Sequence, residues 1–215
     1  MKIIEPSLLA FNRNTIEAQL QEVKAAGAIY IHYDVMDGIF IPQTAFGPQP
    51  LLTIQQYGML SNVHMMVQDP IKWIKDFIDY PINALTFHPE VISEEKCRQA
   101  FELLKTKNIK YGIALKFHID AQQYLNLLKI CDYVCVMSVE PGWGGQAFTS
   151  KAIDNLRKIK QIKDRYNPKL IIQLDGGVNF DVMKTTKSYT DHFVIGSFLM
   201  KQTNKKDVFE FLKTL

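Results

Sequence analysis

Short runs of apolar and β-branched residues alternate along the chain with longer stretches in which apolar residues recur every three or four positions. The short runs predict buried strands of a parallel sheet, and the longer stretches predict amphipathic helices. We expect strands at residues 2–7, 28–35, 61–66, 84–87, 111–115, 133–137, 170–174 and 192–195. We expect helices at residues 15–26, 50–56, 70–79, 93–107, 121–129, 150–165, 180–187 and 207–214.

This order of elements predicts an α/β protein with one strand and one helix in each repeat. Asn14 is the expected N-cap of the first helix, with Glu17 completing a capping box, and Gly27 follows the helix end. An open doubly wound sheet would show the same alternation, but eight units within 215 residues favour closure. We therefore expect a TIM (β/α)8 barrel that spans residues 1–215 as a single domain, with a long loop before residue 48.

Composition and charge narrow the classes of partner. The chain is 47% hydrophobic and 22% charged, with a net charge of +3, and its lysines are scattered apart from Lys205-Lys206. We therefore expect no nucleic-acid partner. Since no apolar run approaches roughly 18 residues, we also expect no membrane partner and a cytoplasmic location. Three irregularly spaced cysteines, Cys97, Cys131 and Cys135, predict neither a disulfide framework nor a thiolate zinc site.

Polar residues stand at the ends of several predicted strands, where barrel enzymes carry their chemistry. His32 and Asp34 are two apart and point to the same side of their strand, His64 lies in the third strand, and Asp175 follows the seventh. A lone histidine in an apolar strand is more often a core residue, and an aspartate after a strand more often forms a turn. Burying all four unpaired would be costly, whereas together they form a ready divalent-metal site.

Other strand ends carry further candidates. Ser7 ends the first strand and His88 follows the fourth, while Asp37, in a Met-Asp-Gly run, is interpreted as a turn residue. Glycine-bearing segments follow the last three strands: Gly142-Trp143-Gly144-Gly145, Gly176-Gly177 and Gly196-Ser197. Each alone fits a tight turn, but three at one barrel mouth predict a phosphate site, since glycine lets backbone N–H groups approach an anion.

Several segments together resemble the ribulose-phosphate 3-epimerase family through nearly the whole chain. They are PSLLAF (6–11), HYDVMDGIFIPQTAFGP (32–48), NVHMMVQDP (62–70), TFHPE (86–90), VMSVEPGWGGQAF (136–148), LDGGVN (174–179) and VIGSFLM (194–200). None of these motifs is specific by itself, but their combination and spacing are. The resemblance implies a (β/α)8 barrel of the ribulose-phosphate-binding type.

The resemblance also implies a role for each matching residue. His32, Asp34, His64 and Asp175 match the family's metal ligands, and Asp34 and Asp175 match its paired acid/base carboxylates. Positions matching substrate and phosphate contacts are Ser7, His64, Gly142, Trp143, Gly144, Gly145, Gly176, Gly177, Gly196 and Ser197. Three methionines match positions around the reacting carbons, although by themselves they would be read as core packing: Met36, Met66 and Met137.

The reaction implied is metal-dependent epimerisation at C3 of D-ribulose 5-phosphate to D-xylulose 5-phosphate through an enediolate, a step of the pentose phosphate pathway. The resemblance implies one divalent metal ion. Zinc is the first expectation, with iron, manganese or cobalt as alternatives, because mixed nitrogen and oxygen ligands accept them all. A small-molecule sugar phosphate is the expected partner, and the resemblance suggests a homo-oligomer.

Departures from the family pattern leave alternatives open. Residues 116–119 replace an Asn-Pro-x-Thr-like turn and residues 188–191 replace Gly-Ala-Asp, so the substrate could be another ketose phosphate such as D-allulose 6-phosphate. A decarboxylase or aldolase barrel is disfavoured because no lysine follows Asp34 until Lys72, so the Asp-x-Lys-x-x-Asp run is absent. A barrel that binds phosphate without catalysis is disfavoured by the pair Asp34 and Asp175.

Overall fold

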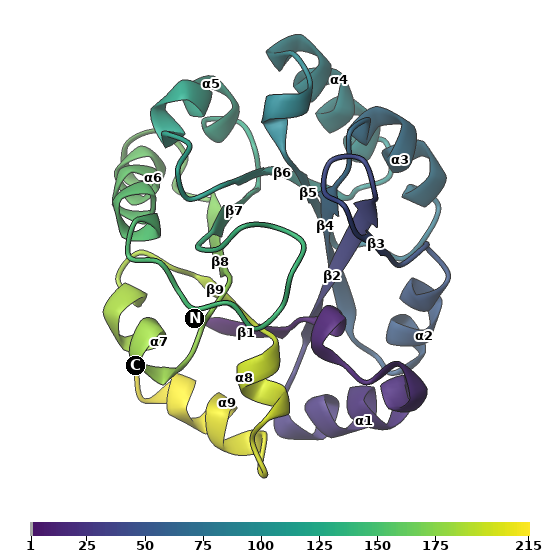
Figure 1. The fold of residues 1–215 in the computed structure, drawn as a ribbon. Coiled ribbons are helices and arrows are strands. Elements are labelled where there is room, and N and C mark those ends of the chain that lie inside the picture. The colour runs from purple at the N-terminus through teal and green to yellow at the C-terminus, as the bar shows by residue number, and fades with distance from the viewer. Residues whose placement is uncertain (1) are drawn as a thin grey trace.

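The chain folds into a closed barrel of parallel strands ringed by helices (Figure 1). The computed structural model describes residues 2–215. The parallel strands are β1 (Ile3–Pro6), β2 (Tyr30–Asp37), β4 (Leu60–Met66), β5 (Ala84–Phe87), β6 (Lys110–Leu115), β7 (Tyr133–Met137), β8 (Ile171–Asp175) and β9 (His192–Ile195). They pair in the order β1-β9-β8-β7-β6-β5-β4-β2, and a parallel bridge between Ser7 and His32 joins β1 to β2. The predicted TIM barrel is confirmed.

One short strand lies where only a loop was expected. β3 (Thr44–Ala45) pairs antiparallel with the last two residues of β2, so that strand runs to Asp37 instead of ending at residue 35. The Asp37 carboxylate accepts hydrogen bonds from the backbone N–H groups of Ile39, Phe40 and Gln68, at 2.8, 2.9 and 2.7 Å. The prediction of a turn residue is confirmed, and the turn folds the loop back on β2.

The helices surround the barrel. They are α1 (Ile16–Ala26), α2 (Pro50–Gln56), α3 (Pro70–Phe77), α4 (Glu94–Lys105), α5 (Leu125–Leu128), α6 (Ala152–Tyr166), α7 (Phe180–Thr186), α8 (Ser197–Met200) and α9 (Lys206–Lys213). Short 3-10 turns lie at Leu8–Ala10, Arg13–Thr15, Pro89–Val91 and Ala121–Tyr124. Within residues 2–215, every helix is too short or too polar to cross a membrane.

The predicted start of the first helix was wrong. The side chain of Asn12, not Asn14, accepts the capping hydrogen bond, from the Asn14 N–H at 3.0 Å, and it caps a 3-10 turn. α1 then begins at Ile16 without a side-chain cap, so Glu17 completes no capping box. The other helix end was predicted correctly: Gly27 has φ +117° and terminates α1. Similarly, the helix expected over 121–129 is divided into a 3-10 turn and α5.

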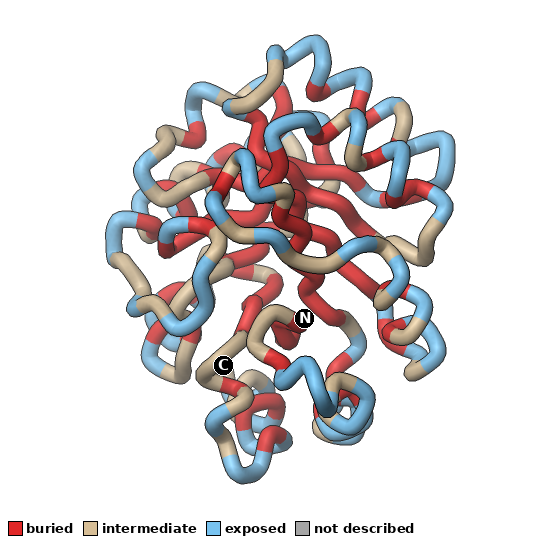
Figure 2. Tube along the Cα trace, turned by 45° about the vertical axis from the view of Figure 1, so that its right-hand side comes forward, coloured by how far each residue is buried: buried red, intermediate tan, exposed pale blue. Residues whose placement is uncertain are grey.

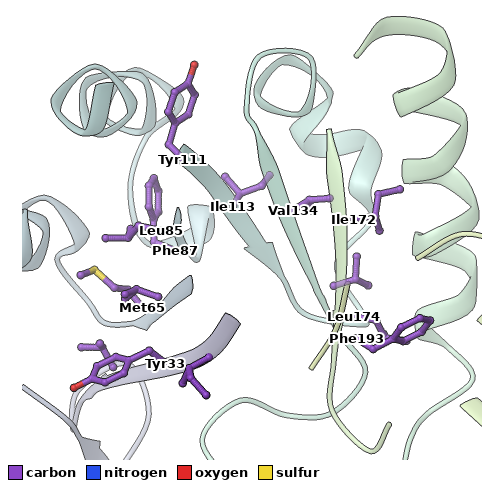
Figure 3. Close-up of a cluster of buried hydrophobic side chains, with 14 of the residues drawn as sticks. Tyr33, Met65, Leu85, Phe87, Tyr111, Ile113, Val134, Ile172, Leu174 and Phe193 are labelled. Carbon is purple, nitrogen blue, oxygen red and sulfur yellow. The ribbon is translucent and has the colours of Figure 1, made fainter. Parts of the chain in front are cut away.

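Alternation along the strands divides the buried side chains into two sets. One set points outward and packs under the helices, as Figure 3 shows for Tyr33, Met65, Leu85, Phe87, Ile113, Val134, Leu174 and Phe193. The buried strands therefore lie inside a shell whose outer surface is exposed (Figure 2). Since side chains two apart share a face, the residues between them on each strand, His32 and Asp34 among them, point into the barrel.

The barrel interior holds a fully buried carboxylate, that of Glu5 on β1. One oxygen lies 2.5 Å from His192 Nδ1 and accepts a hydrogen bond from Asn62 Nδ2 at 2.8 Å. The other accepts from Gln173 Nε2 at 2.7 Å. Burial alone would raise the pKa of Glu5, but its interactions with His192 and His32 together outweigh burial and lower this pKa to about 2. The charge is thus stabilised by partners on three other strands.

We expect Glu5→Gln to lower the free energy of unfolding by about 3 kcal/mol at pH 7, and by about half of that near pH 3. A carboxylate whose pKa is lower in the folded state stabilises the fold above its unfolded pKa of 4.5, and this stabilisation is lost as pH falls from 4.5 to about 2. Glutamine mimics the protonated form. Urea unfolding of both proteins between pH 7 and pH 3 measures the difference, and a difference independent of pH would contradict the assignment.

Candidate active site

Four of the predicted site residues meet at one end of the barrel interior. His32 and Asp34 come from β2, His64 from β4, and Asp175 is the last residue of β8. His32 Nε2 lies 3.2 Å from Asp34 Oδ1 and 3.6 Å from Asp175 Oδ2, and His64 Nδ1 lies 3.4 and 3.9 Å from the same two oxygens. One ligand atom from each residue falls within 4.8 Å of the others. The geometry is that of a compact cation site.

The two histidine nitrogens that face this cluster, His32 Nε2 and His64 Nδ1, are buried and make no hydrogen bond within residues 2–215. A buried polar atom without a partner is unfavourable, and most such atoms in proteins are satisfied. A divalent cation would satisfy both nitrogens and would also neutralise the two carboxylates. Two imidazoles and two carboxylates are a donor set that fits zinc and similar divalent metals.

The pKa values of the two aspartates are shifted in opposite directions. Burial alone would raise the pKa of Asp34, but the adjacent His32 holds it well below its usual range. Burial raises the pKa of Asp175, and the charge of Asp34 adds to that effect. Burial would lower the pKa of His32, but Asp34 and the neighbouring carboxylates raise it well above 6.5. Asp34 is thus the more acidic of the two carboxyl groups and Asp175 the less acidic.

A cavity of about 580 Å³ opens above the cluster. The Ser7 hydroxyl donates a hydrogen bond to Asp34 Oδ2 at 3.1 Å on one side of it. The three candidate methionines form buried parts of its wall, so they border the two aspartates instead of lying in the packing under the helices: Met36, Met66 and Met137.

The glycine-bearing segments all line this cavity. The loop between β7 and α6 crosses the mouth of the barrel in Figure 1, and its residues 142–145 line the cavity together with residues 176–177 and 196–197. Gly177 has φ +60°, and a Cβ built on it would lie 2.3 Å from the backbone nitrogen of Phe148, so only glycine fits. Gly145 lies beside Ser197, because a Cβ built on it would be 3.6 Å from Ser197 Oγ, an ordinary van der Waals distance. The segments predicted to hold phosphate therefore lie side by side.

Other residues near the cluster were not predicted. Glu5 Oε2 lies 3.9 Å from His32 Nδ1, behind the cluster. His88, noted only as a polar residue at a strand end, lies behind His64 with Nε2 atoms 3.1 Å apart, and its Nδ1 is 3.3 Å from Glu90 Oε1. The sequence signal for Glu5 was an acidic residue within an apolar strand, two positions before Ser7 and therefore on the same face. Asp181 and Lys201 also line the cavity.

The two departures from the family pattern lie at different ends of the barrel. Residues 116–119 follow β6 on the side of the site, where Lys116 Nζ lies 3.3 Å from Glu90 Oε1. Residues 188–191 precede β9 and lie at the opposite end, where Asp191 pairs with Lys163 at 2.6 Å. Only the first departure borders the candidate site.

Comparisons with known proteins agree with this geometry. The chain is 33% identical to ribulose-phosphate 3-epimerase of Aquifex aeolicus, covering 92% of this chain and 89% of the relative, and 34% identical to that of Mycoplasma genitalium, covering 91% and 89%. It is 28% identical to the Escherichia coli K12 enzyme of the same name, covering 99% and 95%.

Solved structures show the same fold at lower identity. Tryptophan synthase of Mycobacterium tuberculosis matches with a TM-score of 0.69 at 13% identity, covering 99% of this chain and 91% of that one. Orotidine 5'-monophosphate decarboxylase of Methanocaldococcus jannaschii matches with a TM-score of 0.65 at 15% identity, covering 99% and 96%. The model of the Ribulose-phosphate 3 epimerase family matches residues 3–200. The chain therefore belongs to the ribulose-phosphate 3-epimerase family and is an isomerase.

Proposed function

We propose that the protein epimerises D-ribulose 5-phosphate at C3 to D-xylulose 5-phosphate through an enediolate, with Asp34 and Asp175 as the acid and base. The observation that carries this proposal is the meeting of two aspartates from β2 and β8 beside two unpartnered imidazole nitrogens. Inversion at carbon requires a proton to leave one face and another to arrive on the opposite face. Two carboxylates held on separate strands suit that exchange.

The pKa directions support one assignment of the roles for the reaction that starts from ribulose 5-phosphate. Asp34, whose pKa is lowered, removes the C3 proton of ribulose 5-phosphate, and Asp175, whose pKa is raised, delivers a proton to the other face. The roles exchange when xylulose 5-phosphate reacts. Ser7 donates to Asp34 Oδ2 at 3.1 Å and orients this carboxylate.

The same four residues would hold the metal ion: His32, Asp34, His64 and Asp175. When bound, a divalent cation supplies Lewis-acid stabilisation of the negative charge that develops on the sugar oxygens. We propose zinc as the first candidate, because two imidazoles and two carboxylates form a common zinc ligand set. Iron, manganese and cobalt accept the same donors.

At the other side of the cavity, the segments at 142–145, 176–177 and 196–197 would bind the phosphate. Their backbone N–H groups can approach an anion closely because six of the eight positions are glycine: Gly142, Gly144, Gly145, Gly176, Gly177 and Gly196. Phosphate binding far from C3 supplies energy that fixes the sugar between the two aspartates. The buried methionines on the wall exclude water from the reacting carbons.

The test is incubation of the purified protein with ribulose 5-phosphate in D₂O, with and without added divalent metal, followed by NMR. We expect metal-dependent formation of xylulose 5-phosphate carrying deuterium at C3. Deuterium exchange without xylulose 5-phosphate would direct attention to another ketose phosphate such as D-allulose 6-phosphate, the alternative that the departure at 116–119 leaves open. The absence of exchange with every metal would contradict the proposal.

A further inference from the structure

We propose that His88 and Glu90 are positioning residues for the metal site, because they fix the proton of His64 on Nε2 and leave its Nδ1 free to bind a cation. The inference rests on the proposed function only in that the cluster binds a divalent metal. It assigns a role to the TFHPE segment (86–90), which lies outside the cavity lining.

The two ring nitrogens of His64 face different neighbours. Its Nδ1 faces the carboxylates of Asp34 and Asp175, at 3.4 and 3.9 Å. Its Nε2 points the other way and lies 3.1 Å from Nε2 of His88. A neutral imidazole carries one proton, and the nitrogen that binds a metal must be the other one. Metal binding through Nδ1 therefore requires that His64 Nε2 donate a hydrogen bond to His88.

His88 can accept that hydrogen bond only if its own proton is on Nδ1. This fully buried atom makes no hydrogen bond within residues 2–215, and the carboxylate acceptor beside it is Glu90 Oε1, at 3.3 Å. The inferred arrangement is a directional chain in which His64 donates to His88, and His88 turns its Nδ1 proton toward the Glu90 carboxylate 3.3 Å away. A histidine ligand whose second nitrogen is held by a carboxylate, directly or through a relay, is the usual arrangement in metal sites.

Glu90 in turn is held by Lys116, whose Nζ lies 3.3 Å from Glu90 Oε1. The lysine also lies over the ring of Phe40, 4.4 Å from its centroid, and that ring packs against His88 with centroids 4.8 Å apart. Lys116 is the first residue of the segment that departs from the family pattern. Its ammonium pairs with the Glu90 carboxylate and holds it beside His88, so that the carboxylate remains an acceptor.

A purely structural histidine would give different results. If His88 served only to fill space behind β4, its replacement would change the stability of the metal-free protein and leave metal affinity unchanged. A positioning role predicts the reverse: weaker metal binding at nearly constant stability of the metal-free fold. Metal affinity is therefore the decisive measurement, and it is independent of catalysis.

The experiment is titration of the metal-free full chain with Co²⁺, monitored by its visible absorption, and with Zn²⁺ by competition with a chromophoric chelator. We expect His88→Phe, which fills the space but accepts no hydrogen bond, to weaken binding of both metals by roughly 10- to 100-fold. Glu90→Gln should weaken binding in the same direction by a smaller factor. The Co²⁺ spectrum of each variant should shift, because the His64 ring is no longer held in place.

The matched control is His118→Phe, at a half-exposed histidine on the same end of the barrel that lies 3.7 Å from Glu140 and outside the cluster. It should bind Co²⁺ as the unaltered protein does. Unchanged affinity in both Glu90→Gln and His88→Phe would overturn the positioning role alone, and Glu90→Gln decides the matter if His88→Phe does not fold. Failure of the unaltered protein to bind either metal would overturn the proposed metal site as well.

Discussion

Asp175→Asn is expected to reduce kcat for conversion of ribulose 5-phosphate to xylulose 5-phosphate by about 10³-fold or more, since positioned proton transfer contributes roughly 10²- to 10⁴-fold. Asparagine keeps the shape of the side chain but can neither deliver nor remove a proton. Asp34 remains, so the variant should still exchange the C3 proton of ribulose 5-phosphate with D₂O slowly. NMR in D₂O measures both processes in one experiment.

The control for this variant is Asp154→Asn, at an exposed aspartate in the first turn of α6 that pairs with Arg157 at 3.5 Å. It should retain full activity. Metal content of both proteins must be compared, because Asp175 also belongs to the cation cluster. Turnover of Asp175→Asn close to that of the unaltered protein would remove this residue from the mechanism.

Removal of the metal by a chelator is the second change with a large expected effect. We expect activity to fall by about 10³-fold or more, because the charge of the enediolate would then develop beside two carboxylates without a cation to balance it. Removal should be faster as pH falls, since protonated His32, whose pKa is raised by the adjacent aspartates, competes with the metal. Residual metal and turnover are measured on the same samples.

Metal add-back supplies the control. Zn²⁺ or Co²⁺ should restore turnover because both accept imidazole ligands, whereas Mg²⁺ prefers an all-oxygen octahedral site and should restore little. The melting temperature should rise on add-back of the metals that bind, since a ligand of the folded state alone stabilises it. Full activity in protein without detectable metal would contradict a metal-dependent reaction.

The barrel was predictable because its signal is local and repeated. Each strand of a parallel barrel is buried on both faces, so its sequence is a short apolar run. Each helix shows apolar residues every three or four positions. The cluster was also predictable, since His32 and Asp34 are two apart on one strand and barrel chemistry lies at strand ends. Bounds of the strands differ from expectation by at most two residues.

What the sequence did not predict depends on contacts between distant segments. The hydrogen bond between Glu5 and His192 joins residues 187 positions apart, and only the register of β1 against β9 brings them together. The pairing of His88 with His64 depends likewise on β5 lying beside β4. The wrong prediction of Asn14 as the N-cap has a different cause. Asparagine is a favourable N-cap at either position 12 or 14, and residue preferences do not predict the 3-10 turn at Arg13–Thr15 that makes Asn12 the cap.

The closure of the barrel has a consequence for synthesis of the chain. β1 is the first strand to leave the ribosome, but its in-register partner β9 follows nearly the whole chain later, about 10 to 40 s at roughly 5 to 20 residues per second. During that interval the Ile3–Pro6 edge has no partner on that side. Glu5 and Pro6 protect it, because a charge and a missing N–H discourage pairing with other chains. Glu5, which stabilises the folded barrel, therefore also disfavours aggregation of the chain during its synthesis.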